Sequence, residues 1–159
     1  MINPQSCSGR ASRVLPPVRQ AFPKIRVVPL GVDGRDFGQA IEDAARQCRV
    51  LVVAGGDGTV QLAAAAAMRA DVPLAVLPAG TFNHFARDLG MFPLSRAIAA
   101  IRAGALARVD LGEVNGGIEL PDGPYAIARD GELGEPIDRL RARVLPRALR
   151  VIAPARPRH

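Results

Sequence analysis

Apolar residues recur with two different spacings between residues 24 and 114. Four short runs of aliphatic and β-branched residues have the pattern of strands: 24–30, 50–54, 74–77 and 107–114. Four segments are alanine-rich or carry apolar residues at helical spacing, and they predict helices: 36–47, 60–69, 82–89 and 94–103. Because strands and helices alternate with short connections, the sequence predicts an α/β fold, a parallel sheet with helices on its faces.

The pattern changes after Gly116, where a turn-rich stretch begins. Beyond it, Gly and Pro residues separate three predicted short strands: 125–128, 140–145 and 148–152. These residues are too few to enclose a core of their own. We therefore expect two domains, an α/β domain over 1–116 and a short β remnant over 117–159 that depends on the first domain or on a partner chain.

The composition and charge of the chain argue against a nucleic-acid partner but do not identify one function. The 159 residues are 48% hydrophobic and 23% charged, which is typical of a globular protein, and the formal net charge is +6. The late arginines are not interleaved with aromatic residues that could stack on bases, so we expect no nucleic-acid partner. A solvated face and contact with anionic lipid head groups both stay open for these arginines.

We expect neither a transmembrane span nor a signal peptide in these residues. No apolar run is long enough to span a bilayer, and the N-terminal residues lack the pattern of a signal peptide. Cys7 and Cys48 have neither metal-ligand spacing nor the pattern of a disulfide framework. We expect a cytoplasmic protein, with attachment to the inner face of the membrane left open.

A glycine-rich loop joins the predicted strand 50–54 to the next helix. Gly55, Gly56 and Gly58 let the backbone approach a ligand without interference from a Cβ atom. The N–H groups of such a loop and of the helix start form a site suited to phosphates. Thr59 is expected to cap the helix, and its hydroxyl could serve a phosphate instead.

Asp57 is unusual within this loop, because a carboxylate repels a phosphate ligand unless a cation mediates between them. It therefore indicates Mg²⁺, held through oxygens and water. The alternative is a tight turn in which Asp57 only accepts hydrogen bonds from local amides. The loop is neither a Walker P-loop, since no Gly-Lys-Ser/Thr follows, nor a G-x-G-x-x-G dinucleotide motif.

A second segment, 78–90 (PAGTFNHFARDLG), follows the predicted strand 74–77 with another glycine and another hydroxyl at a helix start. Asn83 and Arg87 lie one helical turn apart, so both are expected to point at the same edge of the sheet as the first loop. For Arg87 the alternative is an ion pair with Asp88 or another surface acid.

These motifs together resemble one family of kinases. Gly-Gly-Asp-Gly-Thr alone is similar to a loop shared by phosphofructokinases, NAD kinases and the diacylglycerol/sphingosine lipid kinases. The segment 78–90 resembles the Gly-Thr-x-Asn-Asp-Phe-Ala-Arg segment of the diacylglycerol kinases, Asn3-Pro4 resembles their first nucleotide-contacting turn, and Val109-Asp110-Leu111-Gly112 a later strand. The resemblance covers residues 1–116 in order and implies a three-layer, phosphofructokinase-like nucleotide-binding domain.

The resemblance also implies an activity, phosphoryl transfer from ATP with Mg²⁺ to a diacylglycerol-like lipid hydroxyl at a membrane surface. It places nucleotide contacts at Asn3, Pro4, Gly55, Gly56, Asp57, Gly58, Thr59, Gly80, Thr81 and Asn83. It assigns Asp57 and Asp110 to the metal, indirectly through water. In the turn Asp130-Gly131-Glu132, it makes Glu132 the proton acceptor and Asp130 its acidic neighbour.

The chain departs from the family pattern in three places. His84 stands where many members have Asp, Gln61 and Leu62 replace the usual Asn-Glu, and the first strand of the family is expected to be clipped at Met1. In addition, about eight residues after Gly116 stand where the family has most of a β-rich domain. Two alternatives therefore stay open beside the lipid kinase: a nucleotide-binding remnant without catalysis, and a soluble kinase similar to NAD kinases. A homodimer also stays open.

Overall fold

The computed structural model describes residues 10–28, 37–116, 128–129, 132–133 and 140–155. The helices are α1 (Arg10–Ala21), α2 (Phe37–Arg46), α3 (Asp57–Arg69), α4 (His84–Asp88) and α5 (Leu94–Ala103). The strands are β1 (Leu51–Gly55), β2 (Leu74–Pro78), β3 (Leu106–Gly116), β4 (Ala128–Arg129), β5 (Glu132–Leu133) and β6 (Leu140–Ile152). None of the helices within these described ranges is long and apolar enough to cross a membrane.

The chain forms two compact units, Met1–Val109 with Leu149–His159, and Asp110–Ala148. The last residues of β6 thus belong to the same unit as β1 and β2, although they lie far from them in the sequence. The domain boundary predicted at residue 116 stays a prediction.

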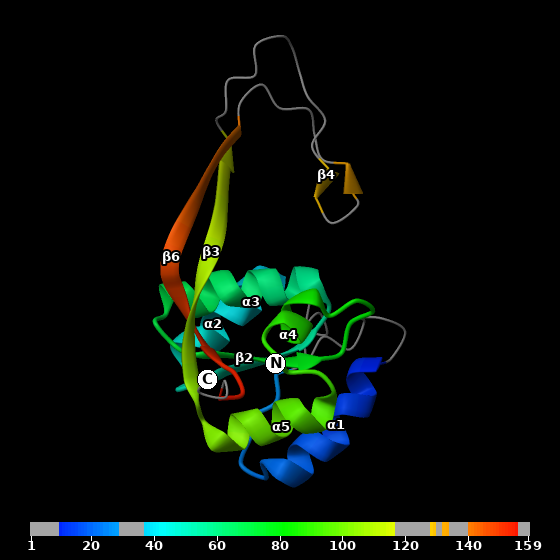
Figure 1. Cartoon of the computed structure of the whole chain (residues 1–159). Coiled ribbons are helices and arrows are strands. Elements are labelled where there is room, and N and C mark those ends of the chain that lie inside the picture. Colours follow the sequence, from blue (N-terminus) through cyan, green and yellow to red (C-terminus); the bar gives the residue numbers. More distant parts are fainter. Residues whose placement is uncertain (1–9, 29–36, 117–127, 130–131, 134–139, 156–159) are drawn as a thin grey trace. The chain divides into compact units, whose positions relative to one another are not determined.

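A four-stranded sheet runs in the order β1-β2-β6-β3, and its first two pairs are parallel. β1 and β2 pair in register from Leu51 opposite Leu74 to Gly55 opposite Pro78, and β6 joins with Val151 opposite Leu74. In the first unit, α2 and α3 cover one face of the sheet, and α1 and α5 cover the other (Figure 1). The predicted α/β class and its parallel sheet between helices are confirmed.

The core is aliphatic, as the low aromatic content requires. Alanines fill the contact between α3 and the sheet, with Ala63, Ala66 and Ala67 fully buried. The largest fully buried side chains come from all three layers: Val18, Ile41, Val53, Leu74, Val76, Leu77, Met91, Leu149 and Val151. Small residues let the helix lie close to the strands, which fixes the position of the loop between β1 and α3.

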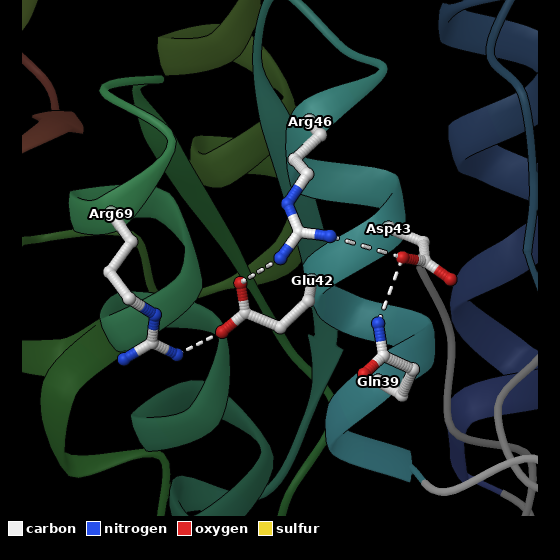
Figure 2. A network of polar contacts seen from close by, with 5 residues as sticks. All are labelled: Gln39, Glu42, Asp43, Arg46 and Arg69. Carbon is white, nitrogen blue, oxygen red and sulfur yellow. Dashed lines mark hydrogen bonds and ion pairs between the residues drawn. The ribbon is translucent and has the colours of Figure 1, made fainter.

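A network of polar side chains joins α2 to α3 at the surface (Figure 2). Glu42 of α2 pairs with Arg69 of α3, and its other carboxylate oxygen lies 3.8 Å from Arg46. Arg46 also lies 3.5 Å from Asp43, whose carboxylate accepts a hydrogen bond of 3.0 Å from Gln39. The Glu42–Arg69 pair is the contact of this network that crosses between the two helices.

The strand predicted at 24–30 is wrong over its described part. Residues 25–28 have no regular secondary structure, and the chain turns just before them, where the N–H of Ile25 donates to the carbonyl of Phe22. Pro23 and Pro29 flank this segment and remove two backbone donors, which weakens a strand that β-branched residues alone would favour.

The other predicted elements of residues 36–114 are confirmed with shifted ends. The helix predicted at 60–69 begins earlier, at Asp57, and the one predicted at 82–89 begins later, at His84. The two strands predicted at 140–145 and 148–152 are one strand, β6, which continues through Pro146. The next residue, Arg147, adopts a positive φ of 52°, and its N–H donates to Asp110 Oδ1 at 2.7 Å. In the prediction 125–128, only Ala128 lies within the described residues, where it opens β4.

Candidate functional site

Two loops leave the sheet at the same edge. β1 ends at Gly55 and β2 at Pro78, and these two residues are partners in the parallel register. A Cβ atom added to Gly80 would lie 2.6 Å from Cα of Gly56 and 3.3 Å from the carbonyl oxygen of Gly55. The backbones of the two loops therefore touch, and the predicted placement of both glycine-rich turns on one edge is confirmed.

The first loop turns directly into α3. Gly56 is the N-cap residue, with an extended backbone, and no side chain caps the helix there. Thr59 is therefore not the cap that its sequence position suggests, because the helix begins before it. Its side chain is buried instead against Gly55, where an added Cβ would lie 2.7–2.9 Å from the Thr59 side-chain atoms. The side chain of Thr59 thus packs under the loop at Gly55 and holds the loop backbone in place.

Gly58 differs from Gly55 and Gly80, whose missing side chains are explained by neighbouring atoms. It lies in the first turn of α3, is exposed, and an added Cβ would meet nothing within 4 Å. In the middle of a helix, glycine is destabilising by about 0.5–1 kcal/mol relative to alanine, and that figure is an upper bound for the first turn. No contact within the described protein accounts for the missing side chain at this position, which faces open space at the start of a helix.

Asp57 is the first residue of α3, where a carboxylate interacts favourably with the positive end of the helix dipole. Across the described ranges, no cluster of three or more His, Cys, Asp or Glu residues could hold a metal ion. Mg²⁺ is commonly held by one or two carboxylates together with the phosphates of a substrate, so one aspartate in a phosphate-suited loop fits that mode. Asp110, the other residue predicted for the metal, belongs to the other unit and accepts the backbone hydrogen bond of Arg147.

The second loop is closed by Asn83. This residue has a left-handed backbone (φ 55°) and is 8% exposed. Its Oδ1 accepts the N–H of Gly80 at 2.7 Å, and its Nδ2 donates to the carbonyl of Gly80 at 2.8 Å. The side chain therefore points back into its own loop rather than out from the edge, and it delays the start of α4 to His84. The adjacent Thr81 is exposed at the edge.

Arg87 lies at the predicted edge beside Gly80 and Thr81, but it does not take the acidic partner that the sequence offers as the alternative. Its Nε donates to the carbonyl of Phe82 at 3.0 Å, and its guanidinium lies over the ring of Phe92, 4.1 Å from the ring centre. The expected ion pair with Asp88 or another acid is not formed within the described chain. A neighbouring stack joins Phe82 to His84, with ring centres 5.5 Å apart.

A cavity of about 370 Å³ opens beside the second loop. Its lining includes Gly80, Thr81 and Asn83 of the loop, with Arg87 and Phe92 after it and Arg13 of α1. Arg13 and Phe92 were missed by the sequence-based reasoning. No pattern in the sequence links Arg13 to this loop, because α1 reaches it only through packing in the folded unit.

A second cavity, of about 350 Å³, contains no residue of either loop. It lies between residues 25–28, α2 and the start of β1, and Cys48 contributes to its wall. Partial burial raises the pKa of the Cys48 thiol, whose Sγ lies 3.5 Å from the carbonyl oxygen of Ala45. This cavity does not adjoin the glycine-rich loops and has no part in the candidate site.

Three of the predicted site residues, Asn3, Pro4 and Asp130, lie outside the described residues. Glu132 opens β5, where it pairs with Arg129 of β4 in a two-stranded antiparallel hairpin. The catalytic role of Glu132 and Asp130 stays a prediction.

Comparison with known proteins agrees with the fold and the loops. Residues 1–114 match the sequence model of a family described as "Diacylglycerol kinase catalytic domain". The chain is 42% identical over 102 residues to a probable lipid kinase YegS-like of Pseudomonas aeruginosa PAO1, covering 62% of this chain and 33% of that protein. It is 36% identical over 81 residues to a diacylglycerol kinase of Bacillus subtilis, covering 48% of this chain and 27% of that protein.

A similar fold occurs in the crystal structure of a diacylglycerol kinase from Bacillus anthracis. The match has a TM-score of 0.57 at 28% identity and covers 71% of this chain and 44% of that one. The chain thus spans about a third of the length of the relatives that it matches in sequence.

Proposed function

This chain belongs to the diacylglycerol kinase catalytic-domain family, and from that premise we propose that it binds ATP with Mg²⁺ and takes part in phosphoryl transfer to a lipid hydroxyl. The nucleotide phosphates would lie against the loop Gly55–Thr59 and the segment that begins at Gly80. The names of the relatives, a probable lipid kinase and diacylglycerol kinases, support the reaction class.

The observation that most directly supports a nucleotide site is the unexplained glycine at position 58. Gly55 is explained by the side chain of Thr59 and Gly80 by the backbone of Gly56, but an added side chain at Gly58 would meet no described protein atom. A glycine that is unfavourable for the helix and unneeded for packing indicates that something else must come close. A phosphate at the N-terminus of α3 is such a group, because loop N–H groups and the helix dipole favour an anion there.

The residues of the edge would act mainly by position and charge, which is the usual means of catalysis in phosphoryl transfer. The backbone of Gly56 to Thr59 would hold phosphate oxygens, and Asp57 would hold Mg²⁺ through water. The metal would neutralise charge that develops on the phosphates. The closure of the second loop by Asn83 would keep the hydroxyl of Thr81 in reach of the nucleotide.

On the acceptor side, the proposal gives Glu132 the role of general base. Its carboxylate would take the proton of the lipid hydroxyl, whose oxygen forms the new bond to the γ-phosphorus while the bond from that phosphorus to the bridging oxygen breaks and ADP leaves. Asp130 would be its acidic neighbour. Because the chain spans only about a third of its relatives, this part of the reaction rests on the family resemblance of the hairpin turn.

Transfer of a labelled γ-phosphate tests the proposal. The purified chain is incubated with ATP, Mg²⁺ and mixed micelles containing diacylglycerol, and labelled phospholipid is measured. Label in the lipid is expected for the wild type, and a loss of about 10²-fold or more for Glu132→Gln, since a general base typically contributes 10²–10⁴-fold. Unchanged transfer by Glu132→Gln would contradict its assigned role. ATP binding without transfer would instead favour the nucleotide-binding chain without catalysis.

A further inference from the structure

The cavity beside the second loop is lined by two arginines that do not belong to either glycine-rich loop. Arg13 and Arg87 both line it, and none of its described lining residues is acidic. Its volume of about 370 Å³ lies within the range of small-molecule sites. Two guanidinium groups on one open cavity without a carboxylate predict an anionic ligand.

Arg87 is held in place before any ligand arrives. Its Nε–H is used by the carbonyl of Phe82, and the face of its guanidinium rests on the Phe92 ring at 4.1 Å. Within the described part of the chain, neither Nη group of Arg87 has an acceptor. A guanidinium fixed through one N–H and one face presents its outer N–H groups as a rigid pair, the geometry that matches a phosphate.

We propose that Arg13 and Arg87 form a phosphate-binding wall in the cavity beside the second loop, and that Phe92 positions Arg87 for this contact. The inference rests on the proposed function, because it assigns the bound phosphate to the nucleotide. Gly80 and Thr81 line the same cavity and Gly80 touches Gly56, so one polyphosphate chain can reach from the loop backbone to the two arginines. Arg87 and Arg13 contact the ligand, and Phe92 acts through Arg87.

Calorimetric titration with three ligands tests this wall: ATP, inorganic tripolyphosphate and adenosine. Arg87→Ala and Arg13→Ala are each expected to weaken ATP and tripolyphosphate about tenfold, because a hydrogen bond to a charged group has about that effect on affinity. Adenosine affinity should not change. Arg19→Ala is the matched control, since Arg19 is an exposed arginine of the same helix as Arg13 and does not line the cavity.

Phe92 is tested by two substitutions. Phe92→Leu is expected to weaken tripolyphosphate several-fold, because it removes the aromatic face under the guanidinium, and Phe92→Tyr is expected to keep the wild-type affinity. Urea unfolding of each variant separates a loss of binding from a loss of stability. Equal binding by Phe92→Leu and Phe92→Tyr would overturn the positioning role.

The outcomes distinguish the wall from the proposed function. ATP binding that Arg87→Ala and Arg13→Ala leave unchanged would overturn the wall alone. Arginine-dependent binding of tripolyphosphate without any binding of ATP would support the wall and overturn the nucleotide assignment. A lipid phosphate is the other source of the same chemistry, so vesicles of phosphatidylglycerol are included. If Arg87→Ala weakens vesicle binding and leaves ATP affinity unchanged, the proposed nucleotide contact is wrong.

Discussion

Gly55, Gly58 and Gly80 lack a side chain for three different physical reasons. Gly55 is restricted by the packed Thr59, Gly80 by the backbone of Gly56, and Gly58 by no contact within the described residues. Their sequence pattern predicted one shared purpose, an approach to phosphate. The structure separates the two glycines that let the loops fit together from Gly58, where an added Cβ would meet no described atom.

Gly80→Ala is expected to destabilise the first unit. The added Cβ would lie 2.6 Å from Cα of Gly56, so backbone must move, and overpacking of this kind costs about 1–3 kcal/mol. Urea unfolding measures the change in free energy. Gly58→Ala is the matched control, expected to keep or raise stability by up to about 1 kcal/mol, because alanine favours the helix and its methyl group would meet no described atom. Wild-type stability of Gly80→Ala would show that the two loops are not in contact.

At the scale of elements, the sequence predicted those helices and strands that follow from the local spacing of apolar residues. Alanine-rich and aliphatic periodicity identified α2, α3, α5, β1 and β2, because these segments are buried on the faces that their patterns indicate. It could not identify features that depend on distant partners. The N–H of Arg147 in β6 donates to the carboxylate of Asp110, and the side chain of Asn83, just before α4, is held by Gly80.

The candidate site also contains residues that local sequence pattern indicates and residues that only the folded structure brings together. The glycines, Asp57 and Thr81 are candidates from the sequence because a phosphate loop is a local motif between a strand and a helix, and their roles stay predictions. Arg13 and the stack of Arg87 on Phe92 could not be predicted, because they depend on how α1 and the chain after α4 pack around β2. Candidate site residues can therefore be found from the sequence when they all lie in one loop between a strand and a helix.

The contact between α2 and α3 offers a test of packing at this scale. Glu42→Gln is expected to lower stability by about 0.5–1 kcal/mol, because it weakens the pair with Arg69 across the two helices, and the loss should shrink at high salt. Asp43→Asn is the control, since the described partners of Asp43 lie within α2 itself. A double-mutant cycle with Arg69→Ala measures the pair alone. Equal losses for the two single variants would argue against a bridge between the helices.

At the scale of the whole molecule, the order of the chain and the order of the sheet differ. β6 comes last in the sequence, yet its end lies beside β2, and Leu149, Val151 and Ile152 are buried in the first unit. A predicted β remnant that depends on the first domain is consistent with this burial. The unit that carries both glycine-rich loops therefore needs the C-terminal residues of the chain for its sheet.

The central claim is that this unit binds a nucleotide through the backbone of the first loop, and calorimetry of ATP with Mg²⁺ on wild type and Gly58→Ala tests it most directly. We predict that the wild type binds ATP and that Gly58→Ala, folded and at least as stable, binds it about tenfold or more weakly, because the new methyl group occupies the space of a phosphate. Equal affinity of the two proteins for ATP, or no heat of binding from the folded wild type, would contradict the account.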